Sequence, residues 1–173
     1  MMKKLSLLFG CLILAAALMV GCTTVPTVVS HGVPNLVMVD NGIYRGGQPT
    51  DEGWVYLKSL GVTNVVKLNE ISEGSDQYAV RLGMTVNYHP INLADQLILK
   101  PNKKDFLEAV NEIKPGTFVH CEHGQDRTGL AVGAFRVTKE HVNKKTAYAE
   151  MLAHGFHKAL HGLNDFWEDN IGN

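Results

Sequence analysis

The segment TFVHCEHGQDRTG, residues 117–129, brings together side chains that can perform chemistry. Cys121 follows a short apolar run that predicts a strand, and the stretch from Arg127 to about residue 139 predicts a helix. The loop between them can turn successive backbone N–H groups inward, and the helix N-terminus adds free N–H groups and the positive end of its dipole. Such an arrangement binds an oxyanion such as phosphate.

Each residue type in the loop has a chemical role in this interpretation. The Arg127 guanidinium matches two phosphate oxygens, and Gly124 allows backbone angles that other residues resist. An anion-binding loop also favours the thiolate of Cys121, which can attack phosphorus and form a cysteinyl-phosphate that water hydrolyses. The sequence therefore predicts a phosphate-binding loop made of Glu122, His123, Gly124, Gln125, Asp126 and Arg127.

Three other interpretations of these residues have to be considered. Cys121 is the only cysteine beyond residue 22, so it is either an inert core thiol or a functional one. His120, Cys121 and His123 suggest zinc, but they are close neighbours on one loop and lack a fourth ligand nearby. His154, His157 and His161 share a helical spacing, for which a solvated or partly buried face is preferred over a metal site. We therefore predict no metal and no cofactor.

The elements around the loop predict a single α/β domain. Strands are expected near residues 35–40, 42–47, 62–69, 84–89 and 117–120. Helices are expected after Thr50, and near residues 75–82, 102–113, 127–139, 143–154 and 158–169. This alternation favours a mostly parallel central sheet with helices on both faces. Ligands then bind beyond the carboxyl ends of the strands, where Cys121 lies.

The N-terminus has the pattern of a secretory leader. Lys3 and Lys4 precede an apolar run over residues 5–20, and Gly21 and Cys22 close it. It resembles a bacterial lipoprotein signal, in which the cysteine becomes the lipidated N-terminus, although Met19 stands where leucine is usual. An uncleaved membrane anchor is the alternative. We expect a signal over 1–21, an extended tether over 22–35 and the catalytic domain over 36–173.

The balance of acidic and basic residues limits which classes of partner the chain can bind. The chain has 16 basic and 17 acidic residues and loses two of the basic ones with its leader. Nothing here indicates a nucleic-acid binder. We expect a monomer, held to a membrane only through its N-terminal lipid and exported to the periplasm. Thr23, where aspartate would retain a lipoprotein in the inner membrane, implies the outer membrane.

The motif His-Cys-x5-Arg-Thr-Gly at residues 120–129 is the signature of the cysteine-dependent tyrosine and dual-specificity phosphatases. The segment IYRGGQPTDEGWVYLKSLGVTNVVKLN resembles the opening of their small bacterial and fungal members, with Gly46 in place of serine. The resemblance extends over most of residues 36–169 and is closest to periplasmic tyrosine phosphatases. It implies a dual-specificity phosphatase-like fold, a sulfur-directed hydrogen bond from Thr128, and an orienting role for His120.

This family also uses an aspartate on a loop as general acid. Asp95, 26 residues before Cys121, follows a predicted strand and is the preferred candidate. Asp105 is expected on a solvated helix face, and Asp76 as a helix cap. Arg45 has two candidate roles, a contact with the substrate and a structural pairing beneath the catalytic loop. The structural role is preferred.

The predicted function is hydrolysis of phosphotyrosine, with phosphoserine and phosphothreonine as further candidates. The loop carries Glu122 and Asp126 and no lysine, so additional phosphates would be repelled. Hydrolysis of inositol phosphates or phosphoinositides is an alternative, and a phosphate-binding module without turnover is another.

Overall fold

The computed structural model describes residues 31–172, and the predicted leader, Cys22 and most of the predicted tether lie outside this range. Its centre is a five-stranded sheet in the order β1-β2-β5-β3-β4. The strands are β1 (Val37–Asp40), β2 (Ile43–Gly46), β3 (Asn64–Lys67), β4 (Thr85–Tyr88) and β5 (Thr117–His120). Only the β1–β2 pair is antiparallel; all other pairs are parallel. The mostly parallel α/β sheet predicted from the sequence is therefore confirmed.

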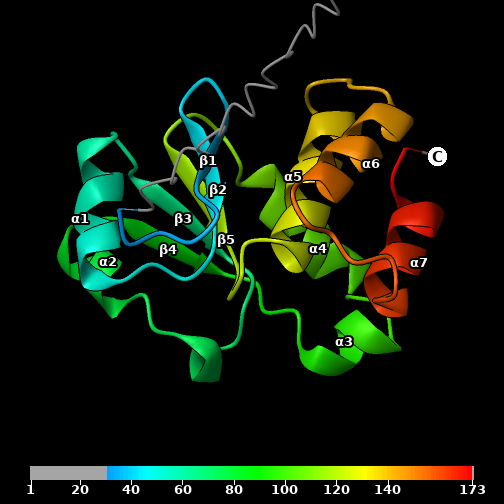
Figure 1. The fold of residues 1–173 in the computed structure, drawn as a ribbon, viewed down its shortest axis with the longest axis horizontal. Helices are drawn as coiled ribbons and strands as arrows, with labels where there is room; N and C mark the ends of the chain where they lie inside the picture. Colours follow the sequence, from blue (N-terminus) through cyan, green and yellow to red (C-terminus); the bar gives the residue numbers. More distant parts are fainter. Residues whose placement is uncertain (1–30, 173) are drawn as a thin grey trace, which may run out of the picture.

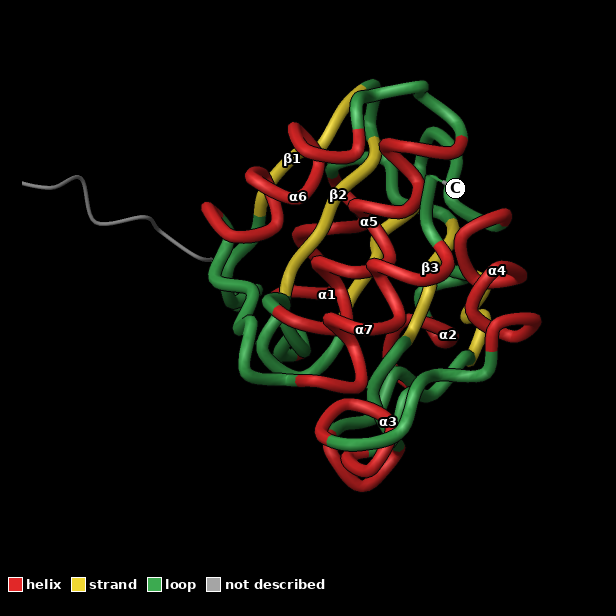
Figure 2. Tube along the Cα trace, turned by 90° about the vertical axis from the view of Figure 1, so that its right-hand side faces the viewer, coloured by secondary structure: helices red, strands yellow, loops and turns green. Residues whose placement is uncertain are grey.

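Helices cover both faces of this sheet (Figure 1). On one side lie α1 (Asp51–Ser59) and α2 (Gln77–Arg81). On the other lie α4 (Lys103–Asn111), α5 (Asp126–Thr138), α6 (Lys144–Ala153) and α7 (His161–Asn170). Two short elements, the 3-10 helix η1 (Ile71–Glu73) and the helix α3 (Leu93–Leu97), were not predicted. In both Figure 1 and Figure 2, α3 lies at the lower end of the molecule.

Side-chain alternation along the strands builds two cores. Val65 and Phe118 join the core beneath α1 and α2, whereas their neighbours Val66 and Val119 join the core beneath α4 to α7. Successive residues of a strand point to opposite faces, so the two central strands must be apolar on both sides. β5 is buried at every position, which fixes the end of the strand from which the cysteine loop starts.

α1 begins where the sequence predicts, whereas α7 begins at His161, three residues after its predicted start. The Thr50 side chain accepts a hydrogen bond from the Gly53 amide, and this caps α1. Residues 31–35, which the sequence places in the tether, pack onto the domain. Val33 is fully buried, and the Gly32 and Pro34 carbonyls accept hydrogen bonds from Thr50 and Gly47. The folded unit therefore includes this end of the predicted tether.

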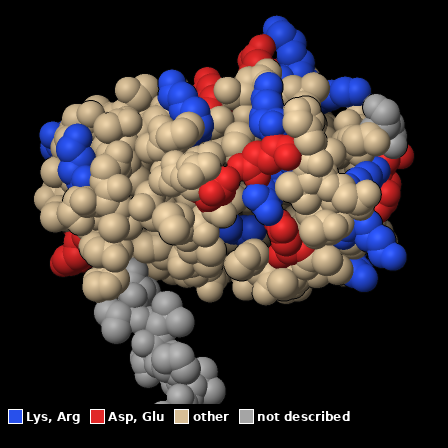
Figure 3. Space-filling model, turned by 90° about the horizontal axis from the view of Figure 1, so that it is seen from above, with Lys and Arg blue, Asp and Glu red and all other residues tan. Residues whose placement is uncertain are grey.

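The face drawn in Figure 3 has no large patch of charged side chains of one sign. Acidic and basic side chains stand next to one another there rather than forming a field of one sign. Within residues 31–172, no helix combines the length and the apolar character needed to span a bilayer.

Candidate phosphate-binding active site

The loop between β5 and α5 is held with its carbonyl groups pointing outward. The acceptors are the carbonyl oxygens of Glu122 (from Gln48 N, 2.9 Å), His123 (from Asn35 Nδ2, 2.9 Å), Gly124 (from Arg45 Nη2, 3.0 Å) and Gln125 (from Gly129 N, 2.8 Å). A trans peptide places its N–H opposite its C=O, so the amides that follow these carbonyls turn inward. The Gly124 amide lies 3.3 Å from the Cys121 sulfur.

The inward amides remain available to a ligand. Among the described residues, nothing accepts a hydrogen bond from the backbone N–H groups of Glu122, His123, Gln125 or Asp126. The first turn of α5 continues the same set of donors, as every helix N-terminus does. The loop therefore forms a concave ring of donors around the cysteine sulfur, suited to a tetrahedral oxyanion.

Three glycines let this loop pack tightly against the end of β2. Gly124 has φ +76°, in the left-handed region, as the sequence predicts. A Cβ on Gly124 would lie 2.3 Å from the carbonyl carbon of Gly46, and a Cβ on Gly47 would lie 2.8 Å from the Glu122 carbonyl oxygen. A Cβ on Gly46, the position at which serine is usual, would instead lie 3.0 Å from the Pro34 carbonyl oxygen and 3.1 Å from Phe118 Cε2. A side chain at Gly47 or Gly124 would push the loop off its support.

Arg127 is buried at the floor of the ring and is held by a glutamate that the sequence analysis missed. Its Nη1 and Nη2 donate to the two carboxylate oxygens of Glu73 at 2.6 and 2.9 Å, and Nη1 also donates to the Ile91 carbonyl at 3.3 Å. Burial would lower the pKa of Arg127, but its hydrogen bond to Glu73 and the charges of Cys121, Glu73 and Glu122 raise it above the usual arginine value. The guanidinium is therefore fixed in place and fully charged.

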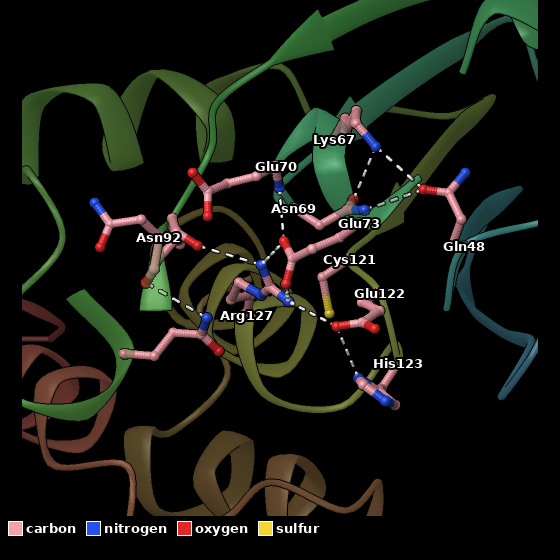
Figure 4. Close-up of polar contacts among 12 residues, drawn as sticks. Gln48, Lys67, Asn69, Glu70, Glu73, Asn92, Cys121, Glu122, His123 and Arg127 are labelled. Atoms are coloured by element: carbon pink, nitrogen blue, oxygen red, sulfur yellow. Dashed lines mark hydrogen bonds and ion pairs between the residues drawn. The ribbon is translucent and has the colours of Figure 1, made fainter. Parts of the chain in front are cut away.

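Glu73 is itself positioned by η1. Its carboxylate also accepts a hydrogen bond from the Glu70 amide at 2.8 Å, which completes a capping box at the start of η1. The hydrogen bonds from Arg127 outweigh partial burial and keep the pKa of Glu73 below its usual range. Figure 4 shows Glu73 and Glu122 around the Arg127 guanidinium, with Cys121 beside it. Glu122 lies 3.8 Å from Arg127 Nη2 and is half-exposed.

Beneath the loop, a buried polar network fixes His120. His120 Nε2 and Asp76 Oδ2 are 2.8 Å apart, and Lys67 Nζ lies 3.3 Å from the other oxygen of Asp76. Asp76 stands at the N-cap position of α2, as predicted, but its side chain makes no capping hydrogen bond there. Burial would raise the pKa of Asp76, but the hydrogen bond and charge of His120, together with Gln48 and Lys67, lower it. Gln48 and Asn69 complete the network (Figure 4).

Thr128 does not make the hydrogen bond to the Cys121 sulfur that the resemblance implies. Its side chain is fully buried, and its hydroxyl has no hydrogen-bond partner among the described residues. Buried hydroxyl groups are normally satisfied, so this exception marks a group kept for a ligand or for the sulfur. The Cys121 side chain is also buried, at the floor of the ring.

The remaining predicted loop residues contribute through their backbone. The side chains of Glu122 and His123 are exposed, and Glu122 Oε2 lies 3.6 Å from His123 Nδ1. The Asp126 carboxylate turns away from the ring and accepts hydrogen bonds from the amide and the ring Nδ1 of His157, at 2.7 and 3.0 Å. Arg45 lies beneath the loop and bonds its carbonyls, which agrees with the preferred interpretation of this residue.

Asp95 lies on α3, outside the ring of donors. The Asp95 amide donates a hydrogen bond to Asn92 Oδ1 at 2.9 Å, which caps α3. The Asp95 side chain makes no hydrogen bond or ion pair with another described residue. α3 rests on α7 at Gly162, where a Cβ would lie 2.0 Å from the Asp95 carbonyl oxygen. Asp95 and Asp105 line the same cavity of about 110 Å³, so the assignment of the acid to Asp95 stays a prediction.

Metal binding has no support in the part of the chain that the structure describes. No group of three or more His, Cys, Asp or Glu side chains within residues 31–172 is arranged to hold an ion. His157, one of the three histidines at helical spacing, instead pairs with Asp126.

Comparisons with known proteins agree with this geometry. Residues 23–163 match the family model described as "DSP-PTPase phosphatase fused to NAD+ Kinase". The dual specificity protein phosphatase TpbA of Pseudomonas aeruginosa is 27% identical over 124 residues, 70% of this chain and 55% of that protein. Inositol diphosphatase DSP2 of rice is 26% identical over 108 residues, 59% of this chain and 53% of the relative. The chain thus spans about half the length of these curated relatives.

Solved structures share the fold. The crystal structure of P. aeruginosa TpbA in complex with pTyr has a TM-score of 0.64 at 20% identity, over 78% of this chain and 83% of that one. The catalytic domain of the PP-IP phosphatase SIW14 from S. cerevisiae, in complex with citrate, has a TM-score of 0.64 at 19% identity, over 79% and 86%. With the family match extending over most of the chain, the protein belongs to the dual-specificity-type protein tyrosine phosphatases.

Proposed function

We propose that this protein hydrolyses phosphate monoesters, with phosphotyrosine as its main substrate, through a cysteinyl-phosphate on Cys121. The observation that carries the proposal is the ring of inward amides around the Cys121 sulfur, closed by a guanidinium that Glu73 holds. Donors fixed in advance at the positions of the phosphoryl oxygens stabilise the charge that develops there in the transition state. The family and its relatives support the same chemistry.

The mechanism has two steps. In the first, the Cys121 thiolate attacks phosphorus, the bond to the leaving oxygen breaks, and Asp95 gives that oxygen its proton. The loop amides and Arg127 hold the three remaining phosphoryl oxygens. In the second step water attacks the cysteinyl-phosphate and gives a proton to the Asp95 carboxylate, the sulfur–phosphorus bond breaks, and inorganic phosphate leaves. The unpartnered Thr128 hydroxyl can donate to the departing sulfur.

Charge around the site favours a substrate with one phosphate. Glu73 and Glu122 are the partly exposed charged groups beside Arg127, and Lys67 is buried against Asp76. Each carboxylate repels a second phosphate on the substrate. Hydrolysis of inositol phosphates remains the second candidate function, because several relatives are inositol diphosphatases. The intact Cys121, Arg127 and Thr128 argue against a binding module without turnover.

We further propose that the mature protein is a monomer tethered to the outer membrane by lipid on Cys22, with its domain in the periplasm. The leader over residues 1–21, Cys22 and Thr23 support this placement. No metal or nucleic acid takes part in the proposed reaction.

The catalytic assignment predicts a specific pattern of losses. Cys121→Ser should lower kcat for p-nitrophenyl phosphate by about four orders of magnitude, because hydroxyl is a poor nucleophile here. EDTA should leave the wild-type rate unchanged. Asp95→Ala should lower kcat for phenyl phosphate by about 10²- to 10⁴-fold, the usual contribution of a general acid. Asp105→Ala is the matched control; a larger loss there would reassign the acid, and turnover by Cys121→Ser would disprove the thiolate mechanism.

The Glu73–Arg127 contact predicts a loss of turnover without a loss of fold. Glu73→Gln keeps the shape but removes the charge and one acceptor, so the guanidinium is held less firmly. We expect kcat/KM for p-nitrophenyl phosphate to fall by about 10- to 100-fold, as small misplacements of catalytic groups do. Glu70→Gln is the control, since no hydrogen bond or ion pair joins Glu70 to Arg127 within residues 31–172, and it should stay near the wild-type rate. Equal rates for both variants would refute the positioning role.

The two carboxylates beside Arg127, those of Glu73 and Glu122, predict an order of preference among substrates. A phosphotyrosyl peptide should give a higher kcat/KM than a phosphoseryl peptide, inositol hexakisphosphate or an inositol diphosphate. Glu122→Lys should raise kcat/KM for the inositol polyphosphates by about tenfold, the scale of one reversed charge near the surface, while Glu122→Gln should raise it less. A wild-type preference for inositol diphosphates would favour the second candidate function instead.

The lipid anchor predicts selective labelling. Cells that express the protein and are fed labelled palmitate should transfer label to the wild-type chain and to Cys11→Ala. Cys22→Ala should carry none. Label that persists in Cys22→Ala would contradict lipidation at this cysteine.

A further inference from the structure

A second cavity lies behind the phosphate-binding loop, on the side away from the inward amides. It has a volume of about 610 Å³, within the range of small-molecule sites. One wall is the segment 33–37, and the opposite wall is residues 153–155 at the end of α6. The floor comprises Arg45, Gly124 and Gln125. We call this space the rear cavity.

Arg45 brings a buried positive charge to this floor. The residue is 3% exposed, and among the described residues only its Nη2 has acceptors, the carbonyls of Gly124 at 3.0 Å and Gln125 at 3.4 Å. A guanidinium has five N–H donors, so most of them are unused. Within residues 31–172 no carboxylate forms an ion pair with Arg45. Burial lowers the pKa of Arg45 to about 10, although the charges of Cys121 and Glu150 act in the opposite direction.

The walls of the rear cavity contain no carboxylate that could neutralise this charge. Their other titratable group is His154, which is exposed at the rim, and burial and the charge of Arg45 lower its pKa. Glu150 lies in an adjoining cavity of about 180 Å³ that Arg45 also lines. Its two oxygens are already engaged by Arg136 Nε and Nη2, each at 3.0 Å. A buried cation with unused donors and no paired carboxylate is costly unless an anion joins it.

We propose that the rear cavity binds a small soluble molecule with a single phosphate or carboxylate group. The anionic group lies on the free donors of Arg45, with His154 as a second donor, and the body of the molecule packs against the apolar side chains of the segment 33–37. This site is separate from the catalytic ring, because the loop backbone lies between them. The remaining apolar lining is typical of pockets that orient a ligand by one polar anchor.

Occupancy of the rear cavity should change catalysis without blocking the substrate. Arg45 both holds the loop carbonyls outward and contributes positive charge beneath Cys121. An anion on Arg45 cancels part of that charge, so the loop stabilises the phosphoryl transition state less well. The ligand therefore acts as a noncompetitive inhibitor, whereas an anion in the catalytic ring competes with substrate.

The first test is binding, and it does not depend on activity. The Arg127→Ala protein, which lacks the catalytic guanidinium, is titrated with inorganic phosphate and, separately, with acetate while its backbone amide NMR signals are followed. Saturable shifts at Leu36, Ala153 and Gly155 are expected with at least one of the two anions, and the more effective one identifies the anchor chemistry. An absence of saturable shifts at these residues with both anions overturns the proposal, whether or not the protein is a phosphatase.

The second test is kinetic. Inorganic phosphate should inhibit the wild-type enzyme with a competitive component, from the catalytic ring, and a noncompetitive component, from the rear cavity. His154→Glu places a carboxylate beside Arg45, so it should weaken the noncompetitive component by about tenfold and, like the bound anion, should itself lower uninhibited turnover. His161→Glu, an exposed histidine outside the cavity, is the matched control and should behave like wild type. Purely competitive inhibition, or equal inhibition of the two variants, contradicts the coupling.

Discussion

The site depends on the hydrogen bonds that pull the loop carbonyls of residues 122–125 away from the sulfur. The donors come from the segment before β1, from β2, from the segment after β2 and from α5, so the loop is supported from behind on several sides. Because a peptide group is planar, fixing each carbonyl outward fixes the next amide inward. The anion-binding ring is thus a consequence of contacts on its outer surface. The close approach of Gly46, Gly47 and Gly124 is what allows those contacts to form.

A second set of contacts places charge around this ring. The Glu73 carboxylate holds Arg127 by two hydrogen bonds, and the Lys67–Asp76–His120 network fixes the residue before Cys121. These groups come from β3 and the segment that follows it, next to β5 in the sheet. Since parallel neighbouring strands bring their carboxyl ends to one edge, the residues after β3 meet the residues after β5 there. The topology of the sheet therefore explains why these buried charges converge.

Local signals predicted much of this structure. The strand at residues 117–120, the helix that follows Arg127 and the Thr50 cap depend on short-range periodicity and turn chemistry, and all three are observed. Glu73 was missed because its partner lies 54 residues away, and Asp76 was assigned as a cap because its partner His120 lies 44 residues away. The sequence predicts a loop where α3 lies, because five residues are too few to show a helical period. The packing of α3 against Gly162 of α7 is a long-range contact that no local pattern reveals. Only the assembled sheet supplies these contacts.

The central claim is that the outer contacts of the loop make the Cys121 sulfur the group that receives the phosphoryl moiety. The most direct measurement is a rapid acid quench of the enzyme mixed with a ³²P-labelled phosphotyrosyl peptide, followed by mapping of the label on the chain. We expect transient label on Cys121 alone, with the acid stability of a phosphothiol ester, appearing before inorganic phosphate is released. Phosphate release with no labelled cysteine, or label on a histidine instead, would contradict the account.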